Sequence, residues 1–529
     1  MATDLLIVGA GFAGLCLLER ARRMGLNAVV LEAADGVGGT WYHNRYPGAR
    51  VDIQSLEYSF GFSDALQQEW QWSERYSAQP ELLRYANHIA DRFGLREAIH
   101  LNTRVEGAVF DEEQACWRVR SADGREWTTR FLAMATGPLS TPNRPAFDGL
   151  DRFAGRVLHT ADWPHEPVDF HDRHVAVIGT GSSAVQAIPI LAREARALTV
   201  FQRTPAYAVP ARNGPLDPAF ERRVKADYPG FRARNRRMRV GFGAEYPPNR
   251  EKAVEVDEAR RQQMFEERWR YGGFSFLAAF SDVLTDPVAN EMAAEFLRGK
   301  IREIVRDPRT AELLSPRHTL GCKRLCVDTG YYETFNRPNV ELVDVGTRPI
   351  EAIVERGVVT GGRTYPCDVL VLATGFDAMT GTLTRLDVRG RGGLPIAQAW
   401  RDGPVNYLGL MVAGFPNLFN LVGPGSTSAF TTMTVAIEQH VDWIADCIAY
   451  LAEHGKRTIE PTPDAQAQWV GTVNEAADET LFLTCNSWYL GANVLGKPRV
   501  FMPYAAGFPT YAKQCADAAA DGYRGCVLA

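Results

Sequence analysis

The chain has 529 residues, of which 46% are hydrophobic and 23% charged, a composition that excludes disordered and fibrous proteins. Its 58 Lys and Arg against 63 Asp and Glu give a net charge of −5, which argues against nucleic acid or an anionic membrane as partner. This length predicts two or three domains, with a small molecule as the expected partner.

Neither the start of the chain nor its cysteines predict export. Asp4 precedes the first apolar run with no basic region before it, so we expect no secretory signal, and no later stretch is apolar enough to cross a bilayer. The nine cysteines are scattered and odd in number, which favours reduced thiols and a cytoplasmic protein. Cys322 and Cys326 are interpreted as two small apolar side chains.

The first elements form a strand, a glycine turn and a helix. The apolar run Leu5 to Val8 predicts a buried strand, residues 9–14 a turn, and Leu15 to Met24 a helix that ends at Gly25. A second strand, Ala28 to Leu31, carries Glu32, which can accept hydrogen bonds from ribose hydroxyls but repels a 2′-phosphate. We therefore expect FAD here, on Gly9, Gly11, Phe12, Ala13, Gly14 and Glu32.

The same pattern recurs near residue 175. Val175 to Ile178 predicts a strand, residues 179–184 a turn, Val185 to Ala195 a helix and Leu198 to Phe201 the next strand. Just after this last strand come Arg203 and Thr204, a cation and a hydroxyl, which suit the 2′-phosphate of NADPH and so favour NADPH over NADH. The expected contacts are Gly179, Thr180, Gly181, Ser182, Ser183, Ala184, Arg203 and Thr204. Two dinucleotide sites imply hydride transfer between nicotinamide and flavin.

The alternation of strands and helices stops between Pro210 and Arg317. Charged stretches with helical spacing, Arg222 to Arg239 and Glu251 to Arg270, predict a helical insertion there, and the basic run from Arg232 is expected to be a solvated helix face. The fold class is therefore α/β, with two Rossmann-like dinucleotide-binding domains and a helical insertion in the NADP domain. Two further strands are expected at Val340 to Val343 and Val369 to Leu372.

The predicted domains alternate along the chain. The FAD domain takes residues 1–145 and 377–529, the NADP domain 146–209 and 321–376, and the insertion 210–320. In the last part, Phe419 to Val422 predicts a strand and Thr431 to His454 an amphipathic helix closed by Gly455. Cys485 to Tyr511 is expected to be loop, mobile over about 484–504.

Longer motifs resemble one enzyme family. Residues 153–164, with Phe, Gly, His, Trp and Pro in a fixed spacing, resemble the fingerprint of Baeyer–Villiger monooxygenases. The stretch 38–52, with Gly-Gly-Thr-Trp, Tyr-Pro-Gly and Asp52, resembles the second signature of that family. Similarity continues at Lys323-Arg324, 331–333, 373–377 and 486–489, so it covers nearly the whole chain.

This resemblance implies an FAD-containing, NADPH- and O₂-dependent enzyme that converts a ketone to an ester or lactone, through a C4a-peroxyflavin and a Criegee-type adduct. It implies that Arg324 keeps the peroxide anionic and that Asp52 orients Arg324. Lys323 would join Arg203 on the 2′-phosphate. Further FAD contacts are expected at Gly39, Thr40, Trp41, Asp52, Tyr58, Val105 and Met433, and further NADP contacts at Arg50, Gln186, Lys323, Arg324 and Trp488.

Three alternatives are weighed against ketone oxygenation. Heteroatom oxygenation is disfavoured because related N- and S-oxygenating enzymes lack the ending Trp163-Pro164. A non-oxygenating flavin disulfide reductase would need a redox cysteine pair near the flavin motif, and a silent nucleotide sensor would not need both Arg324 and Asp52. For His159 a structural or gating role is favoured over catalysis. No metal site is predicted, since His165, His171 and His174 lack companion ligands, and no obligate protein partner is evident.

Overall fold

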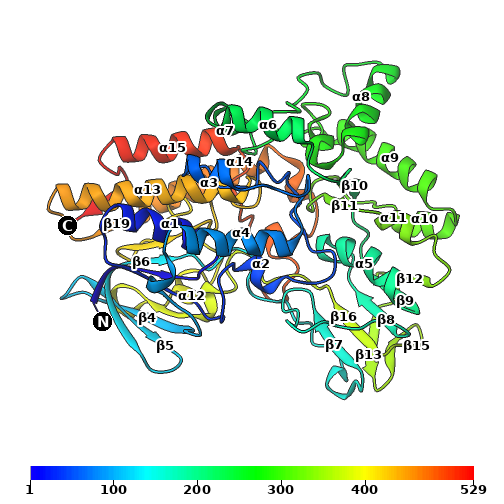
Figure 1. The fold of residues 1–529 in the computed structure, drawn as a ribbon, viewed down its shortest axis with the longest axis horizontal. Helices are drawn as coiled ribbons and strands as arrows, with labels where there is room; N and C mark the ends of the chain where they lie inside the picture. Colours follow the sequence, from blue (N-terminus) through cyan, green and yellow to red (C-terminus); the bar gives the residue numbers. More distant parts are fainter. Residues whose placement is uncertain (1) are drawn as a thin grey trace.

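The computed structural model describes residues 2–529 and contains two main β-sheets that lie side by side, each flanked by helices (Figure 1). A third region of helices (green in Figure 1) stands above the second sheet. The α/β class with two Rossmann-like units is confirmed. Among residues 2–529, no helix combines the length and the apolar character needed to span a bilayer.

The first sheet has the order β17-β4-β5-β6-β1-β2-β3, and β18 pairs with β6. β1 runs parallel to β2 and β6, whereas β4, β5 and β6 form an antiparallel meander. The apolar run from Leu5 is buried as expected, but β1 begins at Ala2 because residues 2 and 3 pair with β6. The bounds are β1 Ala2–Val8, β2 Ala28–Leu31, β3 Ile99–His100, β4 Val105–Asp111, β5 Cys116–Ser121, β6 Glu126–Met134, β17 Asp387–Arg389 and β18 Leu418–Asn420.

The second sheet is parallel throughout, in the order β12-β9-β8-β16-β7. Its strands come from both sides of the helical region, so the chain leaves this sheet after β9 and returns at β12. The bounds are β7 Arg156–His159, β8 His174–Ile178, β9 Ala197–Gln202, β12 Val340–Asp344 and β16 Val369–Leu372. Smaller sheets are β10 Ala208–Pro210 with β11 Cys326–Asp328, β13 Ile350–Val354 with β14 Gly357–Thr360 and β15 Arg363–Pro366, and β19 Ile459–Pro461 with β20 Cys526–Leu528.

The helices after the two glycine turns begin three residues earlier than expected. α1 is Phe12–Arg23 and α5 is Ser182–Glu194, because the last residues of each turn already have helical geometry. Gly25, with φ of 74°, ends the first helix as predicted. The other helices near the first sheet are α2 Thr40–His43, α3 Asp64–Glu69, α4 Gln79–Arg92, α12 Ile396–Ala399, α13 Met433–Glu453, α14 Pro463–Asp478 and α15 Phe508–Ala520.

The helical region is confirmed, with two corrections. Its helices are α6 Pro218–Ala226, α7 Tyr228–Arg236, α8 Glu258–Tyr271, α9 Pro287–Ile304 and α10 Pro308–Leu314, and α11 Tyr331–Thr334 follows. The stretch 222–239 is two helices, because the Asp227 side chain caps a new helix start by accepting from the Gly230 N–H. Arg232 is buried, not solvated, and donates to Gln67 and Ser59, which fastens this region to the first sheet's helices.

Towards the C-terminus, α13 matches the expected amphipathic helix. The expected loop, Cys485 to Tyr511, contains a short 3-10 helix, Trp488–Leu490, and ends four residues early because α15 begins at Phe508. The expectation of reduced cysteines is wrong for one pair. Cys322 forms a disulfide with Cys485, whose Cα lies 6.0 Å away. The two residues are 163 positions apart, so only the tertiary fold brings them together. The remaining seven cysteines, including Cys326, are free.

Candidate active site

The first glycine turn joins β1 to α1 and leaves room for a ligand at the helix start. A Cβ on Gly9, where φ is 106°, would lie 2.7 Å from the Ala135 carbonyl oxygen, and one on Gly14 would lie 1.9 Å from that of Gly9. A Cβ on Gly39 would lie 2.9 Å from the Gly11 Cα. No side chain caps α1, so its first N–H groups are available to an anion. This cradle fits the pyrophosphate of a dinucleotide.

Glu32 lies beside this turn, at the end of β2. Its two carboxylate oxygens accept hydrogen bonds from the backbone N–H groups of Ala10, at 2.6 Å, and Ala34, at 2.8 Å. The side chain is therefore held by the turn itself, where an adenosine ribose would follow the pyrophosphate. This position fits the expected role of Glu32.

The residues expected around the flavin fall into two groups. Trp41, in α2, donates its indole N–H to the Tyr58 hydroxyl at 3.3 Å, and Phe12 and Met433 pack in the same hydrophobic cluster. Burial raises the pKa of Tyr58, so its hydroxyl stays protonated. Thr40 begins α2 beside Trp41. Val105 instead packs in a different cluster of the first sheet.

The second glycine turn, between β8 and α5, repeats the first. A Cβ on Gly179, where φ is 113°, would lie 2.4 Å from the Ala373 carbonyl oxygen, whereas one on Gly181 would meet no atom within 4 Å. No side chain caps α5 either, and Ser182, Ser183 and Ala184 form its first turn. Open space above free N–H groups fits a second pyrophosphate.

Two cations lie together beyond this turn without an acidic partner. Burial lowers the pKa of Lys323, and the nearby positive charge of Arg203 lowers it further. Neither side chain forms an ion pair with any residue in 2–529. Thr204 is fixed by its carbonyl oxygen, which accepts from the Thr180 hydroxyl at 2.9 Å. An uncompensated pair of cations needs an anion, which fits the 2′-phosphate of NADPH.

Gln186 and Arg50 connect the two halves of the site. The Gln186 amide accepts from the Tyr46 hydroxyl at 2.9 Å and donates to the Arg50 carbonyl oxygen at 3.1 Å. The Arg50 guanidinium pairs with Glu74 at 2.8 Å. The Gln186 side chain therefore holds the segment before Asp52 against α5, and the Arg50 side chain ties the same segment to Glu74.

Arg324 and Asp52 form a two-point ion pair. The guanidinium Nε and Nη2 donate to the two carboxylate oxygens at 2.7 and 3.0 Å, and Nη1 donates to the Ala429 carbonyl oxygen at 3.1 Å. The Phe274 ring lies 4.9 Å from the guanidinium carbon. Burial opposes the charge, but Asp52 more than offsets it and the pKa of Arg324 is raised. The site thus holds a permanent, oriented cation.

The C-terminal loop approaches the same cation. Trp488 begins a 3-10 helix, Trp488–Leu490, and packs against Tyr489. Burial raises the pKa of Tyr489, and the nearby positive charge of Arg324 opposes that rise. Sequence reasoning selected Trp488 and missed Tyr489, Ala429 and Phe274. Tyr489 closes the motif 486–489, so its place in that motif was the available signal.

His159 links the two connections between the sheets. Its Nδ1 accepts from the Ala161 N–H at 3.0 Å, and its Nε2 lies 3.1 Å from the Thr374 hydroxyl and 3.3 Å from the Asn143 carbonyl oxygen. Asn143 precedes β7, and Thr374 follows β16. These partners favour the structural role expected for His159.

Comparison with known proteins places this geometry in a family. Residues 6–264, which contain both glycine turns, match the family described as pyridine nucleotide-disulphide oxidoreductase. Relatives include a Baeyer–Villiger monooxygenase of Pseudooceanicola batsensis, 41% identical over 98% of this chain and 95% of its own length. A phenazine N-monooxygenase of Lysobacter antibioticus is 38% identical over 99% of this chain and 97% of its own.

Solved structures agree over the whole chain. A steroid monooxygenase bound to NADP is 51% identical, with a TM-score of 0.95 over 100% of this chain and 99% of the other. The chain belongs to the Baeyer–Villiger monooxygenase family. A complex of the monooxygenase OTEMO with FAD and NADP, 38% identical, also has a TM-score of 0.95, over 100% of this chain and 99% of the other. This family member is an FAD- and NADPH-dependent monooxygenase.

Proposed function

We propose that this enzyme inserts an oxygen atom into a ketone to give an ester or lactone, and that Arg324, oriented by Asp52, is its catalytic cation. Bound FAD, reduced by NADPH, supplies the activation of molecular oxygen. The two-point Arg324–Asp52 pair carries the proposal, since it holds a permanent positive charge in one orientation.

The charge of Arg324 selects the chemistry. Oxygen attacks a carbonyl carbon as a nucleophile, and a nucleophile keeps its strength only while it stays deprotonated. A fixed cation stabilises that negative charge without reorganisation during the reaction. Because a guanidinium remains protonated at every working pH, Arg324 can do this where a lysine or histidine would depend on pH.

The remaining assignments follow the two turns. We assign FAD to Gly9, Gly11, Phe12, Ala13, Gly14 and Glu32, and NADPH to residues 179–184 with Arg203, Thr204 and Lys323. The uncapped helix starts and the unpaired cations described above support both. The domain bounds, 1–145 with 377–529, 146–209 with 321–376, and 210–320, fit the order in which strands enter the two sheets. A cytoplasmic location and the absence of an obligate partner remain part of this proposal.

Nitrogen oxygenation is a second candidate, because the phenazine N-monooxygenase matches nearly the whole chain. Ketone and amine oxygenation require opposite protonation states of the attacking oxygen, so they separate by pH and by substrate. The test is one panel of linear, cyclic, aromatic and steroidal ketones with phenazines and sulfides. Esters formed in step with NADPH consumption support the ketone assignment; N-oxides as the main products would replace it.

A further inference from the structure

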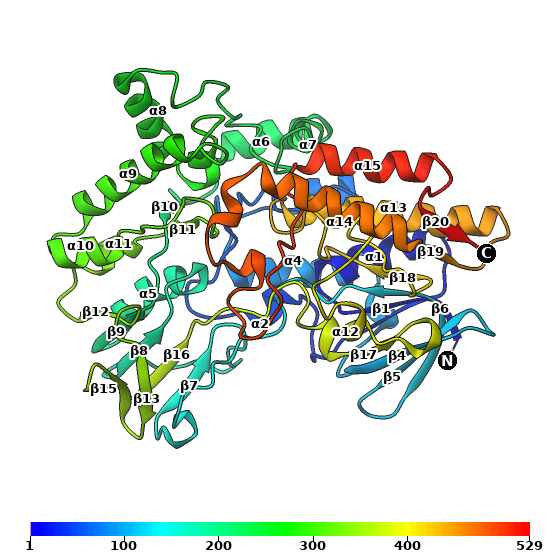
Figure 2. The ribbon, with the colours of Figure 1, turned by 180° about the vertical axis from the view of Figure 1, so that it is seen from behind.

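The C-terminal segment between α14 and α15 is fastened at several points around the site. Figure 2 shows it, in orange and red, running between the two sheet regions. The Asn493 side chain donates to the Phe376 carbonyl oxygen at 2.7 Å, and the Lys497 ammonium pairs with Asp377 at 2.7 Å. These contacts hold the far end of the segment. Its near end carries Tyr489, which reaches Arg324.

The donors of Arg324 can be counted. A guanidinium has five N–H groups. Two donate to Asp52 and one to the Ala429 carbonyl oxygen. Tyr489 is 2% exposed, and its ring centroid lies 4.9 Å from that of Phe430, the residue after Ala429. This packing leaves the Tyr489 side chain little freedom to move away from Arg324. Of the five N–H groups, one on each terminal nitrogen of Arg324 therefore remains to act on another group.

We propose that the Tyr489 hydroxyl accepts one of these two N–H groups, and that Tyr489 is a positioning residue that, with Asp52 and Ala429, fixes the direction of the other. Asp52 holds the Nε and Nη2 edge of the guanidinium, and the Ala429 carbonyl oxygen accepts from Nη1. Tyr489 supplies a contact from the C-terminal segment. The position of that segment thus determines the orientation of the Arg324 guanidinium, an inference that rests on the proposed role of Arg324.

The variant Tyr489→Phe removes the hydroxyl and keeps the ring. The matched control is Tyr331→Phe, which removes a fully buried hydroxyl that has no hydrogen-bond partner in the described chain. The holoenzyme is scored for ester formed per NADPH oxidised and for the rate of flavin reduction by NADPH. A crystal structure of Tyr489→Phe gives the guanidinium orientation of Arg324 independently of turnover.

We expect Tyr489→Phe to lower the ester yield per NADPH about tenfold, as for loss of one hydrogen bond to a charged group, with flavin reduction unchanged. The guanidinium should leave its single orientation, while Tyr331→Phe stays within about twofold of wild type. An unmoved guanidinium with normal yield, or an equal loss in Tyr331→Phe, would overturn the proposal. If the wild type makes no ester, the proposed function fails instead. The two failures are distinguishable because the crystal structure gives the orientation of the Arg324 guanidinium without turnover.

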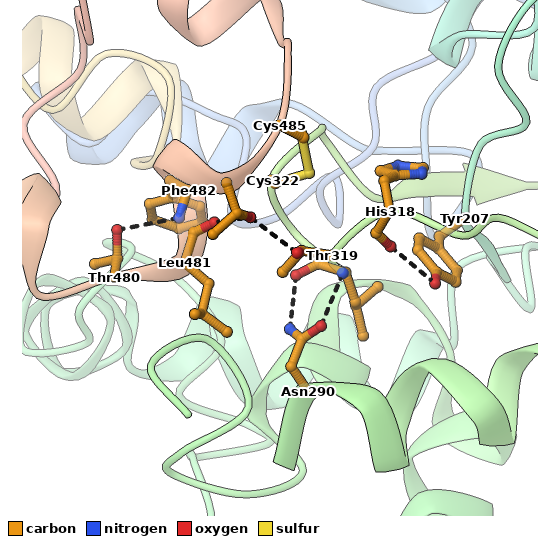
Figure 3. Close-up of a disulfide and its surroundings, with 11 residues drawn as sticks. Tyr207, Asn290, His318, Thr319, Cys322, Thr480, Leu481, Phe482 and Cys485 are labelled. Carbon is orange, nitrogen blue, oxygen red and sulfur yellow. Dashed lines mark hydrogen bonds between the residues drawn. A yellow bond between two sulfur atoms is a disulfide. The ribbon is translucent and has the colours of Figure 1, made fainter. Parts of the chain in front are cut away.

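The disulfide between Cys322 and Cys485 anchors this segment near its start (Figure 3). Cys322 directly precedes Lys323 and Arg324, and Cys485 lies four residues before Tyr489. Next to it, the hydroxyls of Thr319 and Thr484 are hydrogen-bonded at 2.8 Å. Four residues span at most about 14 Å when fully extended, so the disulfide confines Tyr489 to the neighbourhood of Arg324. Without it, the segment depends on weaker, reversible contacts.

We infer that the Cys322–Cys485 disulfide is a reversible redox tether for the C-terminal segment. A dithiol reductant would exchange with it to give two cysteine thiols and the oxidised dithiol. Hydrogen peroxide would restore it, two thiols and one peroxide giving the disulfide and two waters. Cys322 is fully buried and Cys485 is half-buried, so attack begins at Cys485.

Proteolysis reads the state of the tether without turnover. Leu495, in this segment, is fully exposed and is a chymotrypsin site, and its cleavage speeds up when the backbone around it is released and can enter the protease. The holoenzyme is compared before dithiothreitol, after it, and after hydrogen peroxide, with free thiols counted by alkylation and mass spectrometry. Cys485→Ser removes the tether, and Cys526→Ser, which removes a half-buried free thiol, is the matched control.

Reduction should expose two further thiols and speed cleavage at Leu495 about tenfold, and peroxide should reverse both. Cys485→Ser should be cut rapidly in either condition, whereas Cys526→Ser should respond as wild type does. Equal cleavage rates with and without the disulfide, at confirmed reduction, would overturn the inference. So would two free thiols that peroxide fails to join.

Discussion

Removal of the Arg203 guanidinium should change the preference between the two nicotinamide cofactors. Arg203 follows β9 and lies near Lys323, and together they form the unpaired cation pair. One charge-assisted hydrogen bond to a phosphate contributes about 1.5–3 kcal/mol, and 1.4 kcal/mol is about a tenfold change in binding. Because Arg203 is exposed and solvent screens its charge, the lower end applies. Arg203→Ala should therefore raise the KM for NADPH about tenfold.

The same change should leave NADH nearly unaffected, since NADH has no 2′-phosphate. Loss of Arg203 also removes the repulsion that lowers the pKa of Lys323, so the second cation remains charged and limits the effect. The matched control is Arg196→Ala, because Arg196 is exposed at the opposite end of β9 and has no ion pair in residues 2–529. Steady-state kinetics with both cofactors provide the assay. Equal losses with NADPH and NADH, or an equal effect of Arg196→Ala, would refute the reasoning.

Three further predictions follow from single residues. Burial raises the pKa of Glu57 from 4.5 to about 7, so the folded state keeps a proton that the unfolded state loses, and stability falls as pH rises from about 4.5 to 7. At pH 8, Glu57→Gln should raise the free energy of unfolding by about 3 kcal/mol at most, and with it the thermal midpoint, whereas at pH 5 neither should change. Equal shifts of the midpoint at the two pH values would contradict this. Asp52→Asn should leave flavin reduction intact and lower ester yield at least about tenfold, checked by product analysis; normal yield would be inconsistent with an orienting role. Gly14→Ala, whose Cβ would lie 1.9 Å from the Gly9 oxygen, should abolish FAD content, whereas Gly181→Ala should retain FAD and weaken NADPH binding; loss of FAD from both would contradict the assignment.

Local sequence patterns predicted the two nucleotide turns well because their requirements are local. A glycine such as Gly9 must adopt positive φ next to a neighbouring strand, and the tips Glu32 and Arg203 follow directly from the strand lengths. The same logic predicted α13 within two residues of each end. The sequence was sufficient to predict these elements because their geometry depends on residues that are neighbours in the chain.

Long-range contacts defeated the same reasoning. The spacing of Cys322 and Cys485 contains nothing that indicates a disulfide, since the loop before Arg324 and the C-terminal segment meet only in the folded chain. Arg232 was expected in solvent, but it is paired with groups from the region before α4. The Asp227 cap was overlooked because periodicity of charge continued across it. The motif 486–489 contains Tyr489, but only the fold shows that this residue lies near Arg324.

Replacement of Arg324 separates flavin reduction from oxygen transfer to the ketone. The purified holoenzyme and its Arg324→Ala and Arg324→Lys variants are mixed with NADPH, air and a ketone that the wild type converts. Flavin absorbance is followed by stopped flow and products by chromatography. The account predicts that NADPH still bleaches the flavin in Arg324→Ala while no ester forms, and that Arg324→Lys recovers a small, pH-dependent yield. A normal ester yield from Arg324→Ala would contradict it.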